Sequence, residues 1–166
     1  FMWIGMTAND SQPIDRLVEG YHRFRETGWS PYRERWSTLR EGQQPEVMVI
    51  ACSDSRVDPT QIFDVAPGEV FVHRNVANVV VHTDLNCLSV MQFAVDVLKV
   101  KHVMVVGHYG CGGVTAAYEN ADNGLIDSWL RNSKDVQHRY RTRIEAIDDK
   151  EARLNLLCEL NVVTQA

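Results

Sequence analysis

Two short segments of this sequence contain the side chains most able to bind a metal ion. The first is Cys52-Ser-Asp-Ser-Arg56 and the second is His108-Tyr-Gly-Cys111, and each follows an apolar run. Together they offer two thiols, one imidazole and one carboxylate, which are the ligand types of a tetrahedral zinc site. A histidine and a cysteine three positions apart can bind one ion from a tight turn. We therefore predict a zinc site where these two segments meet.

Glycines surround the second segment. Gly110, Gly112 and Gly113 allow the backbone to take unusual dihedral angles and to approach a small ligand closely. A helix that starts here would also turn its free amide groups toward an anion. Gly112 is therefore a candidate substrate contact.

The apolar runs before these segments are predicted to be strands of one sheet. Residues 47–51 are a short, continuous apolar run, which is typical of a strand buried on both faces. The apolar run at 103–106 is predicted to be a second buried strand, and residues 70–74 form a further strand. Strands that alternate with helices form a parallel sheet with right-handed crossovers, and ligands gather outside the carboxyl ends of its strands. The predicted fold class is α/β, a parallel β-sheet core with flanking helices. This topology places Cys52 and His108 at one edge.

Helices are predicted between the strands and before them. Asp58 is placed to cap a short helix, and residues 85–98 predict a longer one. The apolar stripe of this longer helix, which should face the sheet, consists of Leu88, Met91, Val95 and Leu98. Near the N-terminus, helical spacing over residues 11–24 and a weaker pattern over 33–39 predict a helical arm at about 11–40.

The length and composition favour one domain. A chain of 166 residues with 45% apolar content can build one ordinary core. We therefore expect a single domain over residues 1–166, in which the helical arm precedes an α/β core at about 45–166.

The charge and the cysteines exclude several classes of protein. Seventeen basic and twenty-two acidic residues give a net charge of −5, so a nucleic-acid partner is not expected. The apolar runs are too short to cross a bilayer, and we expect no membrane partner and a cytoplasmic location. In that reducing compartment cysteines act as core residues or ligands, and Cys87 and Cys158 are interpreted as packing residues without ligand types nearby.

Three motifs together resemble the β-class carbonic anhydrases, in particular bacterial members. They are Cys52-x-Asp-x-Arg56, the run from Pro67 to Asn78 and His108-x-x-Cys-Gly-Gly113. The resemblance implies a zinc enzyme with one Zn2+ per chain that interconverts carbon dioxide and bicarbonate through a zinc-bound hydroxide. Family members continue beyond Ala166 with a final strand and helices that this sequence does not contain.

The resemblance also implies roles for the residues of the metal site. Cys52, His108 and Cys111 are implied as the metal ligands, and Asp54 with Arg56 as the catalytic pair. Asp54 can be held by Arg56 and accept a hydrogen bond from the water on the ion, or it can be released and become the fourth ligand of a closed site. The sequence leaves these two states open.

Further positions match the substrate pocket of the family. Gln43 matches a glutamine that hydrogen-bonds substrate from the neighbouring subunit, whereas Phe71, Val76 and Phe93 match the apolar wall. Val49 stands where regulated members carry a tryptophan beside a second bicarbonate site, so weak or absent bicarbonate inhibition through that site is expected. The implied assembly is a homodimer or homotetramer.

Two other functions stay open at this point. Relatives on this scaffold include a hydrolase of carbon disulfide, and fold alone does not determine substrate. The second open function is a non-catalytic domain that zinc stabilises, in which Asp54 is the fourth ligand of the ion. Tyr109 and His73 are weak candidates for carrying the released proton.

Overall fold

The computed structural model describes residues 12–28 and 31–166, and the chain divides into two compact units, Phe1–Gly42 and Gln43–Ala166. In the first unit, α1 (Gln12–Arg23) is followed by a π-helical turn, η1 (Phe24–Gly28), and by α2 (Arg33–Leu39). Both helices were expected from the apolar spacing, although the predicted start at Ser11 lies outside the described residues.

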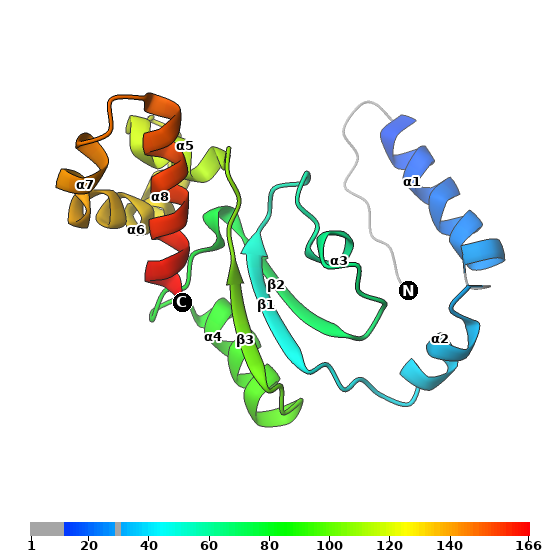
Figure 1. The fold of residues 1–166 in the computed structure, drawn as a ribbon. Helices are drawn as coiled ribbons and strands as arrows, with labels where there is room; N and C mark the ends of the chain where they lie inside the picture. Colours follow the sequence, from blue (N-terminus) through cyan, green and yellow to red (C-terminus); the bar gives the residue numbers. More distant parts are fainter. Residues whose placement is uncertain (1–11, 29–30) are drawn as a thin grey trace. The chain divides into compact units, whose positions relative to one another are not determined.

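The second unit contains the predicted parallel sheet. Its strands are β1 (Val47–Cys52), β2 (Val70–Asn75) and β3 (His102–Val106), in the order β2-β1-β3 (Figure 1). The central strand β1 is buried along almost its whole length, which explains its continuous apolar sequence. In the parallel register, Cys52 at the end of β1 lies opposite Asn75.

Residues 103–106 form the predicted strand, but the prediction that this strand is buried is wrong for its first half. The side chains of Val103 and Met104 are 43% and 37% exposed. These residues are exposed because β3 is an edge strand of the sheet formed by the described residues, and only its end near Val106 is partly covered. A continuous apolar run indicates a strand but does not distinguish a central strand from an edge strand.

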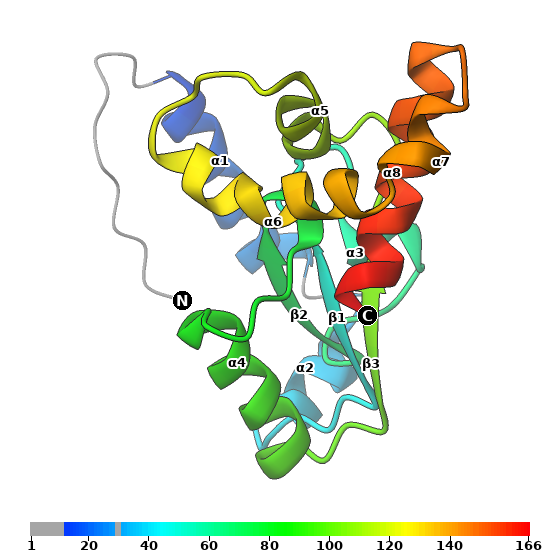
Figure 2. The same cartoon turned by 90° about the vertical axis from the view of Figure 1, so that its left-hand side faces the viewer.

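Helices cover one face of the sheet and the carboxyl ends of its strands. The helices of this unit are α3 (Pro59–Ile62), α4 (Leu85–Gln92), α5 (Gly112–Glu119), α6 (Leu125–Arg139), α7 (Arg141–Glu145) and α8 (Lys150–Gln165). A core under α4 joins Met48 and Ile50 of the sheet to Ala94. A second core lies among α5, α6 and α8, beyond the carboxyl ends (Figures 1 and 2). No helix of the described ranges has the length and apolarity needed to cross a bilayer.

The helix predicted over 85–98 changes its winding part of the way along. It is α-helical to Gln92 and then forms a π-helical turn, η3 (Phe93–Val97). The wider turn rotates the later side chains, so Val95 is 45% exposed instead of facing the sheet. The buried residues on this helical stretch are Cys87 and Ala94. Of the predicted stripe, Met91 packs against the core under α4 as predicted, whereas Val95 does not face the sheet.

The short helix α3 begins as predicted. Asp58 precedes Pro59, and its carboxylate accepts hydrogen bonds from the backbone amide of Thr60 at 2.8 Å and from the Thr60 hydroxyl at 2.6 Å. These bonds satisfy a free amide of the first turn and lower the pKa of Asp58. The cap ends the loop that carries Cys52 and Asp54.

Candidate metal centre

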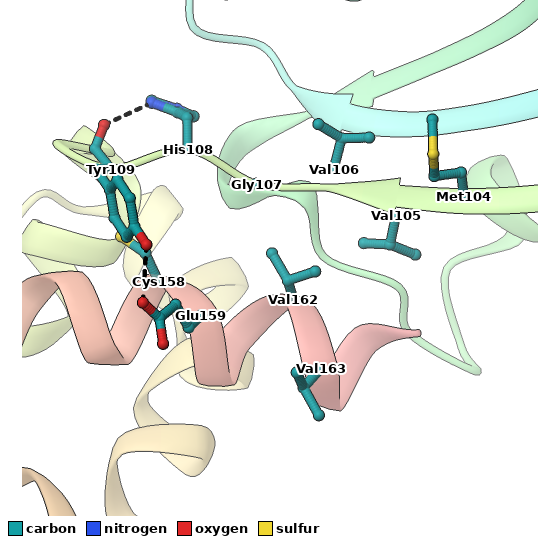
Figure 3. Close-up of a pocket in the computed structure, with 10 residues that line it drawn as sticks. All are labelled: Met104, Val105, Val106, Gly107, His108, Tyr109, Cys158, Glu159, Val162 and Val163. Carbon is teal, nitrogen blue, oxygen red and sulfur yellow. Dashed lines mark hydrogen bonds between the residues drawn. The ribbon is translucent and has the colours of Figure 1, made fainter.

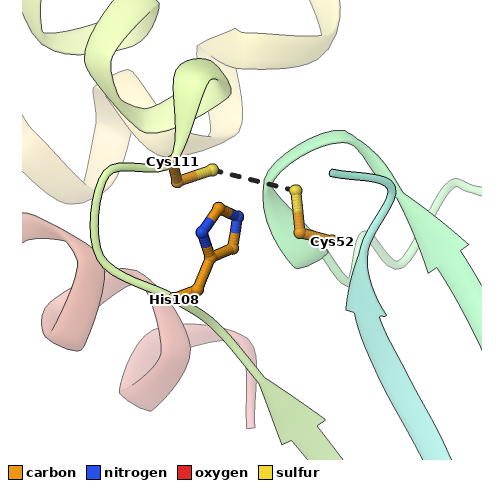
Figure 4. Close-up of side chains that lie close together, drawn as sticks. All are labelled: Cys52, His108 and Cys111. Carbon is orange, nitrogen blue, oxygen red and sulfur yellow. Dashed lines mark hydrogen bonds between the residues drawn. The ribbon is translucent and has the colours of Figure 1, made fainter. Parts of the chain in front are cut away.

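The structure brings the two chemically rich segments together. Cys52 is the last residue of β1, His108 follows β3, and Cys111 immediately precedes α5. Their ligand atoms all lie within 4.8 Å of one another, and the two sulfur atoms are 3.8 Å apart (Figure 4). Two thiolates about 2.3 Å from a tetrahedral zinc ion lie about 3.8 Å apart, so the sulfur spacing fits that ion.

The ring of His108 is oriented as a metal ligand requires. Its Nδ1 lies 2.9 Å from the carbonyl oxygen of Tyr109. Because a carbonyl only accepts, Nδ1 must carry the proton, and Nε2 then presents a lone pair. Nε2 is buried and has no hydrogen-bond partner among the described residues. A bound cation would supply the missing partner.

The two thiols are buried and hydrogen-bonded to each other. Cys52 is 4% exposed and Cys111 is 1% exposed. A hydrogen bond from the Cys111 thiol lowers the pKa of Cys52 to about 4, and the same bond with burial raises the pKa of Cys111. One sulfur is therefore ready to bind a cation, and a cation that binds both displaces the remaining proton.

Asp54 is held by Arg56 in a two-pronged ion pair. Arg56 donates from Nε to Oδ1 at 2.9 Å and from Nη2 to Oδ2 at 2.6 Å, and its backbone amide adds a bond at 3.0 Å. The guanidinium holds the pKa of the Asp54 carboxyl well below its usual range. Oδ2 of Asp54 lies 3.8 Å from Nε2 of His108, so the carboxylate is close to the predicted ligands while it is hydrogen-bonded to Arg56. The structure therefore shows the paired state of Asp54.

Arg74 organises the loop that carries Cys52, Asp54 and Arg56, and sequence reasoning assigned it no role. It donates to the carbonyl oxygens of Cys52 at 2.8 Å, Asp54 at 2.6 Å and Val57 at 3.2 Å. These bonds fix the backbone on both sides of the first ligand. The available signal was the position of Arg74 within the motif from Pro67 to Asn78.

A tight turn after β2 places the start of α5. Ala77 in this turn, η2 (Val76–Asn78), has a φ of +66°, a left-handed conformation that is unusual for alanine. A Cβ atom on Gly113 would lie 2.8 Å from the Val76 side chain, so only glycine fits where the turn meets the helix. Val76 thus lies beside the metal centre, and the neighbouring Gly112 is exposed.

The other predicted pocket residues lie elsewhere in the same chain. Phe71 and Phe93 contact each other with ring centroids 5.9 Å apart, and Phe71 packs in the core under α4. Gln43 is exposed and precedes β1, whereas Cys52 ends it. A six-residue strand is about 20 Å long, so Gln43 cannot reach the metal centre of its own chain.

A groove behind His108 lies between β3 and α8. It has a volume of about 500 Å³ and is lined largely by valine side chains, with His108 and Tyr109 at one end (Figure 3). Neither Cys52 nor Cys111 lines it. The Tyr109 hydroxyl donates to Glu159 on α8 at 2.8 Å, so in this structure it is bonded within the groove (Figure 3).

The fold and this cluster define an α/β protein with a three-ligand metal centre at the carboxyl ends of parallel strands. A family model described as carbonic anhydrase matches residues 47–166. The carbonic anhydrase of Emericella nidulans is 50% identical over 152 residues, which cover 92% of this chain and 67% of that protein. The chain therefore belongs to the carbonic anhydrase family, in its β class.

A solved structure supports the class. One of two tetrameric β-carbonic anhydrases from the filamentous ascomycete Sordaria macrospora matches with a TM-score of 0.87 at 35% identity, covering 93% of this chain and 79% of that one. The carbonic anhydrase of Candida albicans is 40% identical over 126 residues, and the match spans 75% of this chain but only 44% of that protein. All three relatives are fungal, so the particular resemblance to bacterial members stays a prediction.

Proposed function

We propose that this protein catalyses the reversible hydration of carbon dioxide to bicarbonate with one zinc ion held by Cys52, His108 and Cys111. The observation that carries the proposal is the convergence of two buried sulfur atoms and an unpartnered imidazole nitrogen at the strand ends. Family membership supports the same chemistry. When bound, zinc supplies a Lewis acid that makes water nucleophilic near neutral pH.

The protein's own residues orient the reactants. Asp54 is ionised and accepts only, so it aligns a water molecule by taking a hydrogen bond from it. Arg56 keeps this carboxylate beside the metal ligands, and it also donates to the Gly110 carbonyl at 3.1 Å, which ties the two loops together. Gly112 has no side chain and is exposed, so a small substrate can approach the backbone at the start of α5.

The paired state of Asp54 favours a catalytic centre over a purely structural one. A structural zinc site uses four protein ligands, and the described cluster provides three. Asp54, the one carboxylate in position to be a fourth ligand, is occupied by Arg56. This arrangement leaves one coordination position for water or substrate.

We further propose a homodimer or homotetramer in which Gln43 acts on the neighbouring subunit's site. Gln43 lies beyond the opposite end of β1 from its own metal centre, so any contact with substrate must be made in another subunit. Phe71 lies near that same end of the sheet and contacts Phe93, so this pair is placed to accompany Gln43. The solved relatives from Sordaria macrospora are tetrameric.

Stopped-flow hydration of carbon dioxide on metal-analysed protein tests the function. Zinc-loaded wild-type protein should hydrate carbon dioxide at alkaline pH, Cys111→Ser should lose zinc and activity together, and Asp54→Asn should keep zinc but lose most activity. Zinc-loaded wild-type protein without hydration would refute the proposal, and carbon disulfide hydrolysis by that protein would identify the related hydrolase instead. Full activity in Asp54→Asn would remove the role given to Asp54.

A further inference from the structure

A second group of metal-binding side chains lies in the core under α4. His73 comes from β2, Asp84 immediately precedes α4, and Cys87 lies in its first turn. One ligand atom of each residue lies within 4.8 Å of the others. Cys87 is buried, as its interpretation as a packing residue requires. The prediction that no metal-binding side chains lie near it is wrong, because the fold brings an imidazole and a carboxylate to it.

This group is distinct from the first metal centre. His73 lies opposite Ile50 in the register, two residues before the position opposite Cys52. Two strand residues span about 7 Å, so one ion cannot bind both groups. The described ranges contain only these two groupings of three such ligands.

We propose that His73, Asp84 and Cys87 bind a second divalent ion of the zinc or cobalt type. One sulfur, one nitrogen and one oxygen donor suit such a borderline ion better than Mg2+ or Ca2+, which prefer oxygen ligands alone. Donors around a tetrahedral zinc ion lie about 3.4–3.8 Å apart. Small side-chain rotations therefore bring the observed group to bonding distance, and water completes the coordination.

The burial of the group supports a ligand more than ordinary packing. Cys87 is fully buried and His73 is 9% exposed, beside the apolar Met48 and Ile50. A polar side chain in such surroundings is costly unless its polar atoms are satisfied. The one contact recorded for the His73 ring is a weak one of 3.4 Å to Asn75, whose amide already donates to Val79 at 2.7 Å.

Asp84 connects the buried donors to solvent. One of its oxygens accepts a hydrogen bond from the Asn86 amide at 3.1 Å, and no bond is recorded for the other oxygen in the described chain. Asp84 also lines a pocket of about 450 Å³ together with Val81, Thr83 and Trp129. The pocket therefore reaches the group on the side of Asp84, whereas His73 and Cys87 do not line it.

The local charges are compatible with a cation. Burial raises the pKa of the Cys87 thiol, and the nearby Asp84 carboxylate raises it further, so a cation would relieve the repulsion between these two groups. The N-terminus of α4 opposes a cation, but it also stabilises the Cys87 thiolate that the cation needs. The carboxylate and the thiolate together balance a divalent charge.

Cobalt titration of the metal-free full chain tests this second site. Wild-type protein should bind about two Co2+ per chain, and Asp84→Asn and Cys87→Ala should each bind about one. Asparagine keeps the helix cap at position 84, and alanine adds no polar group to the core, so both variants should keep the wild-type circular dichroism spectrum. Cys158→Ala is the control for loss of a buried thiol. Cys158 belongs to neither group of three, although it packs in the same core as Cys52 and Cys111, and this variant should still bind about two Co2+.

A second readout separates this site from the first. In Cys111→Ser protein the absorption of cobalt bound to two thiolates should disappear, while a weaker band from one thiolate should remain and be abolished by adding Cys87→Ala. One Co2+ per wild-type chain at saturation, or no change in stoichiometry in Asp84→Asn, would overturn the proposal. Because these measurements do not use hydration activity, they stand whether or not the protein hydrates carbon dioxide.

Discussion

The ligand set determines how strongly the centre activates water. The thiols of Cys52 and Cys111 are hydrogen-bonded to each other, and a metal ion that both residues bind requires both as thiolates. Two thiolates cancel the formal charge of Zn2+, whereas three neutral imidazoles leave it intact. In a carbonic anhydrase whose zinc ion is held by three histidines, the pKa of the bound water falls to about 7.

The first prediction concerns the pH dependence of hydration. Because the thiolates weaken the acidification of water, the activating deprotonation should occur at higher pH than in a centre with three histidines. The hydration rate constant should therefore rise from neutral to alkaline pH, measured by stopped flow at constant zinc occupancy. A rate constant that stays flat over that range would contradict this account of the ligands.

At the scale of single elements, two adjacent glycines at the start of α5 differ in what surrounds them. A Cβ on Gly113 would lie 2.8 Å from Val76 and 3.1 Å from Ala77, whereas nothing lies within 4 Å of the same atom on Gly112. The second prediction is that Gly113→Ala lowers the free energy of unfolding by about 1–3 kcal/mol, because overpacking forces the turn apart.

The neighbouring position provides the control for this prediction. Gly112→Ala should leave the free energy of unfolding close to that of the wild type or raise it slightly, because alanine favours a helix where space is free. Urea unfolding of both variants measures the difference. Equal stability of the two variants would show that the turn can move without cost.

Elements with a purely local cause were predictable from the sequence. The Asp58 cap and the helix at 33–39 depend on neighbouring residues, and the structure contains both. The exposure of β3 and the π-helical turn at Phe93–Val97 depend on which strand lies at the edge and on how a helix packs. Single-sequence periodicity does not report those tertiary conditions.

At the scale of the whole molecule, a buried amide ties distant elements to the turn beside the metal centre. Asn161 on α8 donates to the Ala77 carbonyl at 2.9 Å and accepts from Ser133 on α6 at 3.1 Å. Asn161 and Ser133 are both almost fully buried. The packing of α6 and α8 therefore holds the turn that positions α5 and Cys111.

The third prediction tests this tie. Asn161→Ala should lower the free energy of unfolding by about 1–3 kcal/mol, because it leaves buried polar groups without partners. Thr164→Ala on the same helix is the control, since its hydroxyl bonds only within α8 and its loss should change stability little. Urea unfolding of zinc-loaded protein measures both, and equal effects would remove the special role of Asn161.

The fourth prediction concerns the assembly. If Gln43 serves the neighbouring subunit, a mixed dimer of Gln43→Ala and Cys111→Ser contains one complete site, built from Cys111 of the first chain and Gln43 of the second. Random mixing by co-expression should then restore about a quarter of wild-type hydration from two slow parents. Activity no greater than the average of the parents would place Gln43 outside the partner's site.

The ligands of the metal centre could be predicted from the sequence, whereas the residues that position them could not. Cys52, His108 and Cys111 have unusual chemistry at the ends of predicted strands, and parallel topology alone brings such ends together. Arg74 acts through three backbone carbonyls. His73 and its two partners meet only after β2 packs against α4. Neither arrangement has a spacing that marks it in the sequence.

The central claim is that two sulfurs and one imidazole nitrogen from separate segments hold one ion. X-ray absorption spectroscopy at the zinc edge tests it most directly, on Cys87→Ala protein, which lacks the proposed second site, loaded with one zinc per chain. The account predicts two sulfur neighbours at about 2.3 Å, with the remaining nitrogen and oxygen neighbours at about 2.0–2.1 Å. A zinc shell with one sulfur neighbour or none would contradict it.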